Sequence, residues 1–134
     1  MLFCRTCNKD QPDDNFFYRG GGRKGRQADC IECSRKRARE YRQLSRDKVS
    51  QYKMLKGCEC CGFQATHSCQ LDLDHVNPKT KTYSGAHKAY DSGWSWERIE
   101  KELNLCTVLC KNCHALRTYE EKHWLNKCTQ VRMR

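Results

Sequence analysis

The fold is decided by three segments, which read Cys58-Glu-Cys-Cys61-Gly62, Leu71-Asp-Leu-Asp74-His75-Val76 and Cys110-Lys-Asn-Cys113-His114. The first and the last each contain a Cys-x-x-Cys knuckle, and two knuckles supply four thiolates for one tetrahedral zinc ion. Closing the chain between them brings Asp74 and His75 towards His114. A carboxylate and two imidazoles beside a rigid zinc site are suited to hold a second, catalytic metal and to act as a general base.

The segment between the knuckles predicts a β-strand. Residues 70–76 alternate polar and apolar side chains, which places Leu71 and Leu73 on one face and Asp72 and Asp74 on the other. In a regular strand His75 then faces away from Asp74. We therefore expect a β-bulge that aims both side chains at one metal ion.

The second half of the chain predicts a helix, a strand and a final helix. Ser95 is a good N-cap, and Trp94 and Ile99 occupy the positions of a hydrophobic staple around it. The tryptophans are therefore expected to pack in the core and not to stack on bases. A strand is predicted over residues 105–109 and a helix over 111–123, with a polar loop over 79–93 and a short tail over 126–134.

The amino-terminal segment, residues 1–33, predicts a second zinc module. Its two knuckles are separated by 22 residues, and its four cysteines are Cys4, Cys7, Cys30 and Cys33. Four thiolates leave no open coordination position, so this zinc is expected to be purely structural. Phe16, Phe17 and Tyr18 lie between the knuckles and are expected to form an apolar patch over the metal.

Disulfide bonds are the alternative use of the twelve cysteines. The start Met1-Leu-Phe-Cys-Arg5 has no apolar signal-peptide core, and no run approaches the roughly 18 apolar residues of a membrane span. We therefore expect a cytoplasmic protein without membrane association, whose thiols stay reduced and bind zinc. Four cysteines have no assigned ligand role: Cys60, Cys69, Cys106 and Cys128.

The charge of the chain points to a polyanionic partner. The formal net charge is +10, from 26 Lys and Arg against 16 Asp and Glu. Residues 34–56 predict a basic helix whose apolar residues, including Val49, Tyr52 and Leu55, share one sector. Four arginines follow one line beside that sector: Arg35, Arg39, Arg42 and Arg46. This line is suited to contact successive phosphates of double-stranded DNA, with a solvated helix face as the alternative.

Residues 53–123 resemble the HNH endonuclease family, also called the ββα-metal or His-Me finger family. The resemblance implies a small α+β fold with a zinc-stapled ββα-metal module over 57–125. A zinc-ribbon-like module over 1–33 and a basic linker helix over 34–56 would precede it. It further implies that His75 activates water and that Asp74 and His114 hold one magnesium or manganese ion. The family's middle asparagine falls at Leu105, with Asn104 beside it.

The expected function is therefore metal-dependent cleavage of DNA. The stretch Gly93-Trp-Ser-Trp-Glu-Arg-Ile99 resembles phage and bacterial members, which favours a homing or restriction enzyme in a bacterial host cell. Arg117 lies on the same helix face as His114 and can contact a phosphate, or equally form a surface ion pair. Because one site cuts one strand, double-strand cleavage requires a homodimer or two binding events. The alternative function is a zinc-dependent DNA-binding protein, a regulator or a degenerate nuclease, that does not cleave.

Overall fold

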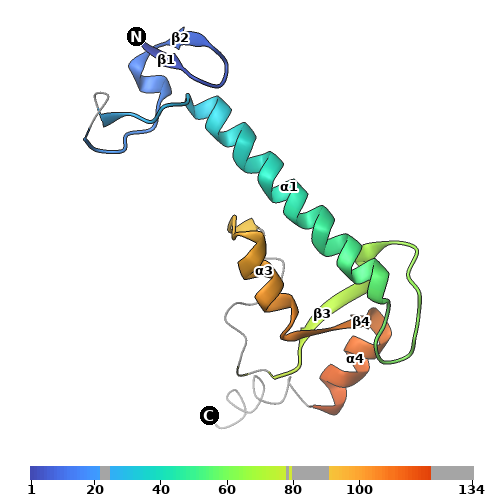
Figure 1. Cartoon of the computed structure of the whole chain (residues 1–134). Helices are drawn as coiled ribbons and strands as arrows, with labels where there is room; N and C mark the ends of the chain where they lie inside the picture. Colours follow the sequence, from blue (N-terminus) through green and yellow to red (C-terminus); the bar gives the residue numbers. More distant parts are fainter. Residues whose placement is uncertain (22–24, 78, 80–90, 122–134) are drawn as a thin grey trace, which may run out of the picture. The chain divides into compact units, whose positions relative to one another are not determined.

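The chain forms two structural units, Met1–Leu44 and Ser45–Arg134, and the boundary between them falls within a long helix, α1. The computed structural model describes residues 1–21, 25–77, 79 and 91–121, in a small α+β arrangement of short antiparallel sheets and helices (Figure 1). Most of the predicted loop over 79–93 and the whole tail over 126–134 lie outside these residues.

The first unit is built on a small hairpin. Strand β1 (Leu2–Cys4) pairs antiparallel with β2 (Lys9–Gln11), and the short 3-10 helix η1 (Asp13–Asn15) follows. Its core consists of Cys4, Phe16 and Cys30, with Leu2, Cys7 and Cys33 packed against them. A single apolar ring and the cysteines thus make up this core, which is too small to be stable without a further crosslink.

The expected aromatic patch over the metal is wrong for two of its three members. Phe16 is completely buried, whereas Phe17 and Tyr18 are 38% and 73% exposed. Tyr18 forms an isolated bridge with Arg26, and its ring lies against Gly25. Gly25 has a φ of 72°, and a Cβ atom there would come within 2.5 Å of the Tyr18 ring, so only glycine fits. Tyr18 therefore supports its own loop and does not cover the cysteines.

Helix α1 spans Ile31–Lys56, so it begins slightly before the predicted start at residue 34 and ends where predicted. Gly57, with a φ of 65°, follows the last helical residue. In the second unit the helix buries Val49, while Leu55 is 86% exposed, so the predicted apolar sector is only partly covered. Among the described helices, none combines the length and apolar character needed to cross a membrane.

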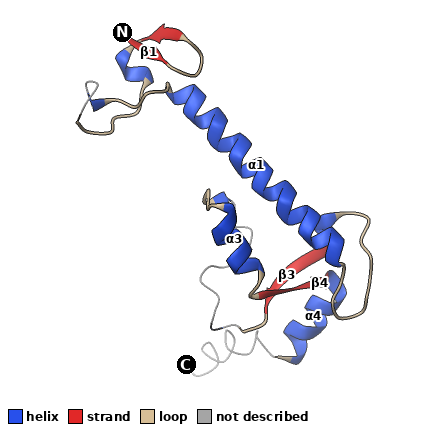
Figure 2. Cartoon of the chain, viewed as in Figure 1, coloured by secondary structure: helices blue, strands red, loops and turns tan. Residues whose placement is uncertain are grey.

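After the end of α1, the second unit continues with a strand, a helix, a strand and a helix (Figure 2). Strand β3 (Leu71–His75) pairs antiparallel with β4 (Cys106–Cys110), helix α3 (Trp96–Leu103) precedes β4, and helix α4 (Lys111–Glu120) starts directly after it. The 3-10 helix η3 (Ser68–Gln70) leads into β3. Leu71 and Leu73 pack in the core as the alternation predicts, against Val108 and its neighbours.

The predicted cap of the middle helix is confirmed. The Ser95 hydroxyl accepts a hydrogen bond from the Arg98 backbone N–H at 3.4 Å. Trp94 and Trp96 pack against the cluster that contains Ile99, as expected for core residues. Helix α3 is thereby fixed against β3, and its last turn lies at the start of β4, where the candidate site is built.

Candidate functional site

Four cysteines of the second unit form a cluster suited to a metal ion. The sulfur atoms of Cys58, Cys61, Cys110 and Cys113 all lie within 4.8 Å of one another. The first knuckle turns because the Gly62 N–H donates to the Cys58 carbonyl at 2.9 Å. The second forms at the start of α4, where the Cys110 sulfur accepts from the Cys113 N–H at 3.4 Å. The first knuckle therefore lies next to the junction of β4 and α4, which carries the second knuckle.

The electrostatics of this cluster favour a bound cation. Burial raises the pKa of Cys58, but backbone N–H groups of Cys61 and Cys110 lower it more, to about 6. Contacts with the Cys110 and Cys61 side chains raise the pKa of Cys113 well above its usual value. The sulfurs therefore cannot all ionise side by side without a cation between them. A zinc ion, which binds thiolates tetrahedrally, supplies that charge.

The first unit carries an equivalent cluster of Cys4, Cys7, Cys30 and Cys33, again with sulfurs within 4.8 Å of one another. The Cys30 N–H donates to the Cys4 sulfur at 3.2 Å. Burial raises the pKa of Cys4, yet backbone hydrogen bonds lower it to about 6, while the contact with Cys30 raises the pKa of Cys33 to about 12. None of the eleven described cysteines forms a disulfide. The two clusters of four cysteines could thus bind two zinc ions, as predicted.

The cysteines without an assigned role lie outside both clusters. Cys60 and Cys69 are exposed, and Cys128 lies outside the described residues. Cys106, the first residue of β4, is buried, and burial together with the nearby Glu102 carboxylate raises its pKa to about 12. Cys106 is therefore an inert core thiol.

Asp74 and His114 are brought together, as the sequence predicted. The Asp74 Oδ1 atom on β3 lies 3.8 Å from His114 Nε2 on α4. Asp72, two residues earlier on the same face, accepts a hydrogen bond from His114 Nδ1 at 2.9 Å. Because an ionised carboxylate can only accept, the Nδ1–H group of His114 donates to Asp72, and Nε2 is the ring atom that faces Asp74. Asp72 thus orients the imidazole, a role that the sequence alone did not single out.

A basic side chain, Arg117, borders this pair. Arg117 Nη1 lies 3.2 Å from Asp74 Oδ2, and Arg117 Nη2 donates to the Val76 carbonyl at 3.3 Å. The Arg117 Nε–H also donates to Glu121 at 2.8 Å, which raises the pKa of the arginine. Arg117 forms ion pairs and also lies at the acidic site. The structure is therefore compatible with both predicted roles, a surface ion pair and a contact with a DNA phosphate.

Lys111 pairs with the orienting carboxylate, Asp72. Its Nζ atom is 2.6 Å from Asp72 Oδ1. Burial raises the pKa of Asp72, but the hydrogen bonds from Lys111 and His114 outweigh it, so the pKa is lowered overall. Asp72 is thus held ionised between two cationic or polar groups, as an orienting carboxylate should be.

His75 does not join this cluster. The pairing of β3 with β4 runs without interruption from Leu71 opposite Cys110 to His75 opposite Cys106, so the expected bulge is absent. Regular alternation turns His75 to the face away from Asp74, where only 7% of the residue is exposed. There its Nε2 atom lies 2.5 Å from Oε1 of Glu102 on α3. Glu102 was not predicted as a site residue, because its partner lies 27 positions away.

The position of the family asparagine is also occupied differently. Asn104 is the C-cap of α3 and donates its backbone N–H to the Glu100 carbonyl at 3.1 Å. Leu105, at the expected place, is 42% exposed. In the part of the chain that the structure describes, groups of three or more metal-ligating side chains occur only in the two cysteine clusters. Asp74 and His114 together offer two ligand atoms.

The arginines of α1 differ in their surroundings. Arg35 and Arg39 are exposed and Arg42 is half-buried, all within the first unit. The Arg35 guanidinium lies 5.9 Å from the centre of the Phe17 ring. In the second unit, Arg46 forms an ion pair with Asp91. The guanidinium groups of Arg35, Arg39 and Arg42 are therefore more available to bind an anion than that of Arg46.

Comparisons with known proteins add no relative to this description. A scan against protein-family models, a search of curated proteins and a search of solved structures each returned no match. What the chain does is therefore inferred from the geometry and chemistry of these side chains.

Proposed function

We propose that the chain is a metal-dependent DNA endonuclease. The observation that carries the proposal is that Asp74 on β3 and His114 on α4 lie 3.8 Å apart, next to the four-cysteine cluster of the second unit. A protein that only binds DNA has no need to orient an imidazole towards a carboxylate in this way. Among DNA endonucleases, the sequence resemblance favours homing and restriction enzymes.

The donor set at this junction fits a divalent cation. Asp74 supplies a hard carboxylate oxygen, and His114 presents Nε2 as an acceptor because Asp72 holds its Nδ1–H. Asp74 and His114 would hold magnesium or manganese, which when bound supplies charge stabilisation for the scissile phosphate and the leaving oxygen. Arg117, 3.2 Å from Asp74, is placed to exchange that ion pair for a DNA phosphate.

His75 is the proposed general base, and Glu102 is its positioning partner. The Glu102 carboxylate accepts from Nε2–H, which leaves Nδ1 unprotonated and able to take a proton from water. The negative carboxylate also stabilises the imidazolium that forms. Because His75 is nearly buried on the strand face away from Asp74, its use as a base requires that DNA binding rearranges the end of β3 so that Nδ1 reaches the face of Asp74 and His114.

The proposed substrate is double-stranded DNA, which the net charge of +10 favours. Arg35, Arg39 and Arg42 are the first candidates for phosphate contacts. Replacing Arg35 and Arg39 by alanine should weaken binding to all sequences alike and make the salt dependence shallower by about 0.9 log units per lost contact. Arg46→Ala, which removes a residue already paired with Asp91, is the matched comparison and should change the slope less.

The deciding experiment is cleavage of supercoiled plasmid with magnesium or manganese. Asp74→Ala, His114→Ala and His75→Ala should each lose cleavage, the last by roughly 10²–10⁴-fold. His67→Ala, an exposed histidine outside the cluster, should cleave like the parent. Zinc content and DNA binding should be unchanged in all four variants. Cleavage by His75→Ala at the parental rate would overturn the assignment of the base.

A non-cleaving DNA-binding protein is the second candidate. The observation that favours it is the burial of His75 against Glu102, on the strand face away from Asp74. In that case the parent protein binds duplex DNA but does not cleave it with any divalent cation. His75→Ala would then lower stability and leave DNA affinity unaffected.

A further inference from the structure

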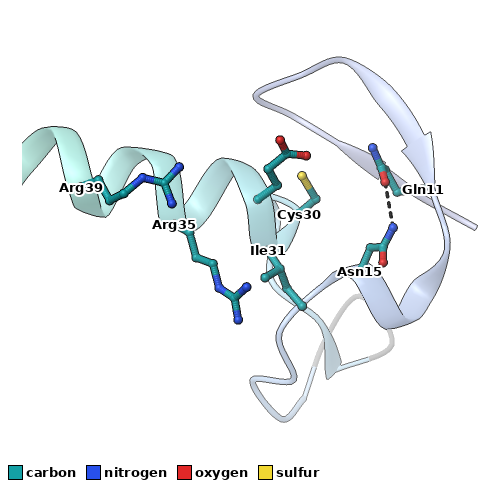
Figure 3. Close-up of a pocket in the computed structure, with 7 residues that line it drawn as sticks. Gln11, Asn15, Cys30, Ile31, Arg35 and Arg39 are labelled. Carbon is teal, nitrogen blue, oxygen red and sulfur yellow. Dashed lines mark hydrogen bonds between the residues drawn. The ribbon is translucent and has the colours of Figure 1, made fainter.

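The first unit contains an open pocket that neither zinc binding nor cleavage uses. Its volume is about 340 Å³, and it lies next to the cysteine cluster, where Cys30 forms part of its lining. Figure 3 shows Gln11 and Asn15 on one side of the pocket and the first turns of α1 on the other. Cys4 and Cys7 come from the hairpin, and Cys30 and Cys33 from the start of α1, so the cluster of these four cysteines holds the two walls together.

The hairpin side carries an ordered pair of amides. The Asn15 Nδ2 group donates to Gln11 Oε1 at 2.9 Å, so each amide fixes the orientation of the other. The remaining Asn15 Oδ1 can accept a hydrogen bond, and the Gln11 NH₂ group can donate one. Gln11 ends β2 and Asn15 ends η1, so both side chains stand on regular backbone.

The helix side carries charges of both signs. Glu32, Arg35 and Arg39 line the pocket from successive turns of α1. The contact of Arg35 with the Phe17 ring orients one guanidinium. A pocket built only for phosphate would repel its ligand with Glu32, so the carboxylate points to a ligand that also has hydrogen-bond donors.

We propose that this pocket reads the edges of DNA bases. Amide side chains pair with adenine, carboxylates accept from the amino group of cytosine, and the two arginines bind the phosphates beside the base. Amides, a carboxylate and guanidiniums surrounding one pocket match this set of partners, whereas the site at β3 and α4 has the chemistry for the backbone. The inference rests on DNA being the ligand of the proposed nuclease, and it assigns sequence recognition to the first unit.

The test is selection of bound sequences from a random duplex library by the full-length, zinc-loaded chain without magnesium or manganese. The parent should enrich a defined motif. The double variant Gln11→Ala/Asn15→Ala should lose preference at one or two adjacent positions, by roughly 5- to 150-fold in relative affinity. Gln51→Ala, an exposed amide on α1 outside the pocket, should enrich the parental motif.

Glu32→Gln tests the pocket without removing side-chain volume. An amide offers a donor as well as an acceptor, so the preferred base should change at a single position while zinc content stays at the parental value. An unchanged motif in both the double variant and Glu32→Gln overturns the proposal, as does a parent that enriches no motif. Cleavage is not measured here, so a chain that reads sequence but fails the plasmid assay would refute the nuclease alone.

Discussion

His75 and Glu102 form a buried imidazole–carboxylate pair, with Nε2 of the histidine 2.5 Å from Oε1 of the glutamate. The side chains are only 6% and 12% exposed. A buried carboxylate is costly unless it has a hydrogen-bonding partner, so this pair is a specific feature of the fold. In the proposed reaction it would fix which imidazole nitrogen receives the proton from water.

Glu102→Gln should lower plasmid cleavage by about tenfold or more while the hydrogen bond to His75 is kept. The amide oxygen can still accept from Nε2–H, but the negative charge that stabilises an imidazolium is gone. Glu97→Gln, at an 80% exposed position of the same helix, is the matched control and should cleave normally. Parental cleavage by Glu102→Gln would show that the carboxylate only fills its place in the core.

Asp72→Asn should weaken binding of manganese by roughly 10- to 100-fold, because the carboxylate orients the His114 ring through Nδ1. The measurement is a calorimetric or spectroscopic titration of the zinc-loaded protein with manganese, without DNA. Glu120→Gln, exposed on α4, is the comparison and should bind manganese like the parent. Equal affinities in Asp72→Asn and the parent would remove Asp72 from the proposed metal site.

The sequence predicted the elements because their signals are local. The Cys-x-x-Cys spacing, the alternation around Leu71 and Leu73, and the Ser95 cap each depend on residues a few positions apart. The direction of His75 depends instead on the register of β3 against β4, which is continuous where a bulge was expected. Its partner Glu102 comes from another element, and no local pattern announces it.

The same distinction applies to the acidic cluster and to the aromatic residues. Asp74 and His114 could be paired from the sequence because the knuckles constrain both segments, but the orienting role of Asp72 requires the distance across β3 and α4. Tyr18 could not be separated from Phe16 by residue type. In the structure Phe16 is completely buried, whereas Tyr18 is largely exposed, with its ring against Gly25.

Cys58→Ser should lower the zinc content from about two ions per chain to about one and unfold the second unit, since loss of a ligand removes folding free energy. The neighbour Cys60→Ser is a close control, because Cys60 is exposed and lies outside the cluster. It should retain both zinc ions and the parental unfolding transition. Loss of zinc from Cys60→Ser would show that Cys60, and not its neighbour in the knuckle, is a ligand.

Lys53→Met should lower the free energy of unfolding of the second unit by about 1–3 kcal/mol. The Lys53 Nζ atom donates to the carbonyls of Ser68 and Leu71, each at 2.9 Å, and thereby ties α1 to the start of β3. Methionine keeps most of the volume but leaves both carbonyls without this donor. Lys101→Met, at a 76% exposed position, should change the free energy by less than about 0.5 kcal/mol in the same denaturant titration.

Arg37→Gln should raise the pKa of Asp29 towards its ordinary value. The hydrogen bond from Arg37, at 2.7 Å, is the main cause of the lowered pKa of Asp29, and the Thr6 hydroxyl adds to it. A lowered carboxyl pKa stabilises the folded state above the unfolded-state value of about 3.9. That contribution disappears as the pH falls through the folded-state pKa.

The measurement is an NMR titration of the Asp29 carboxyl carbon in the parent and in Arg37→Gln, over the acid range in which the first unit stays folded. Arg39→Gln is the matched control, because Arg39 lies on the same helix and has no ion-pair partner within the described part of the chain. It should leave the Asp29 pKa unchanged. If Arg37→Gln and Arg39→Gln give the same Asp29 pKa as the parent, the carboxyl owes its acidity to Thr6 and Arg5, and Arg37 is available to bind phosphate.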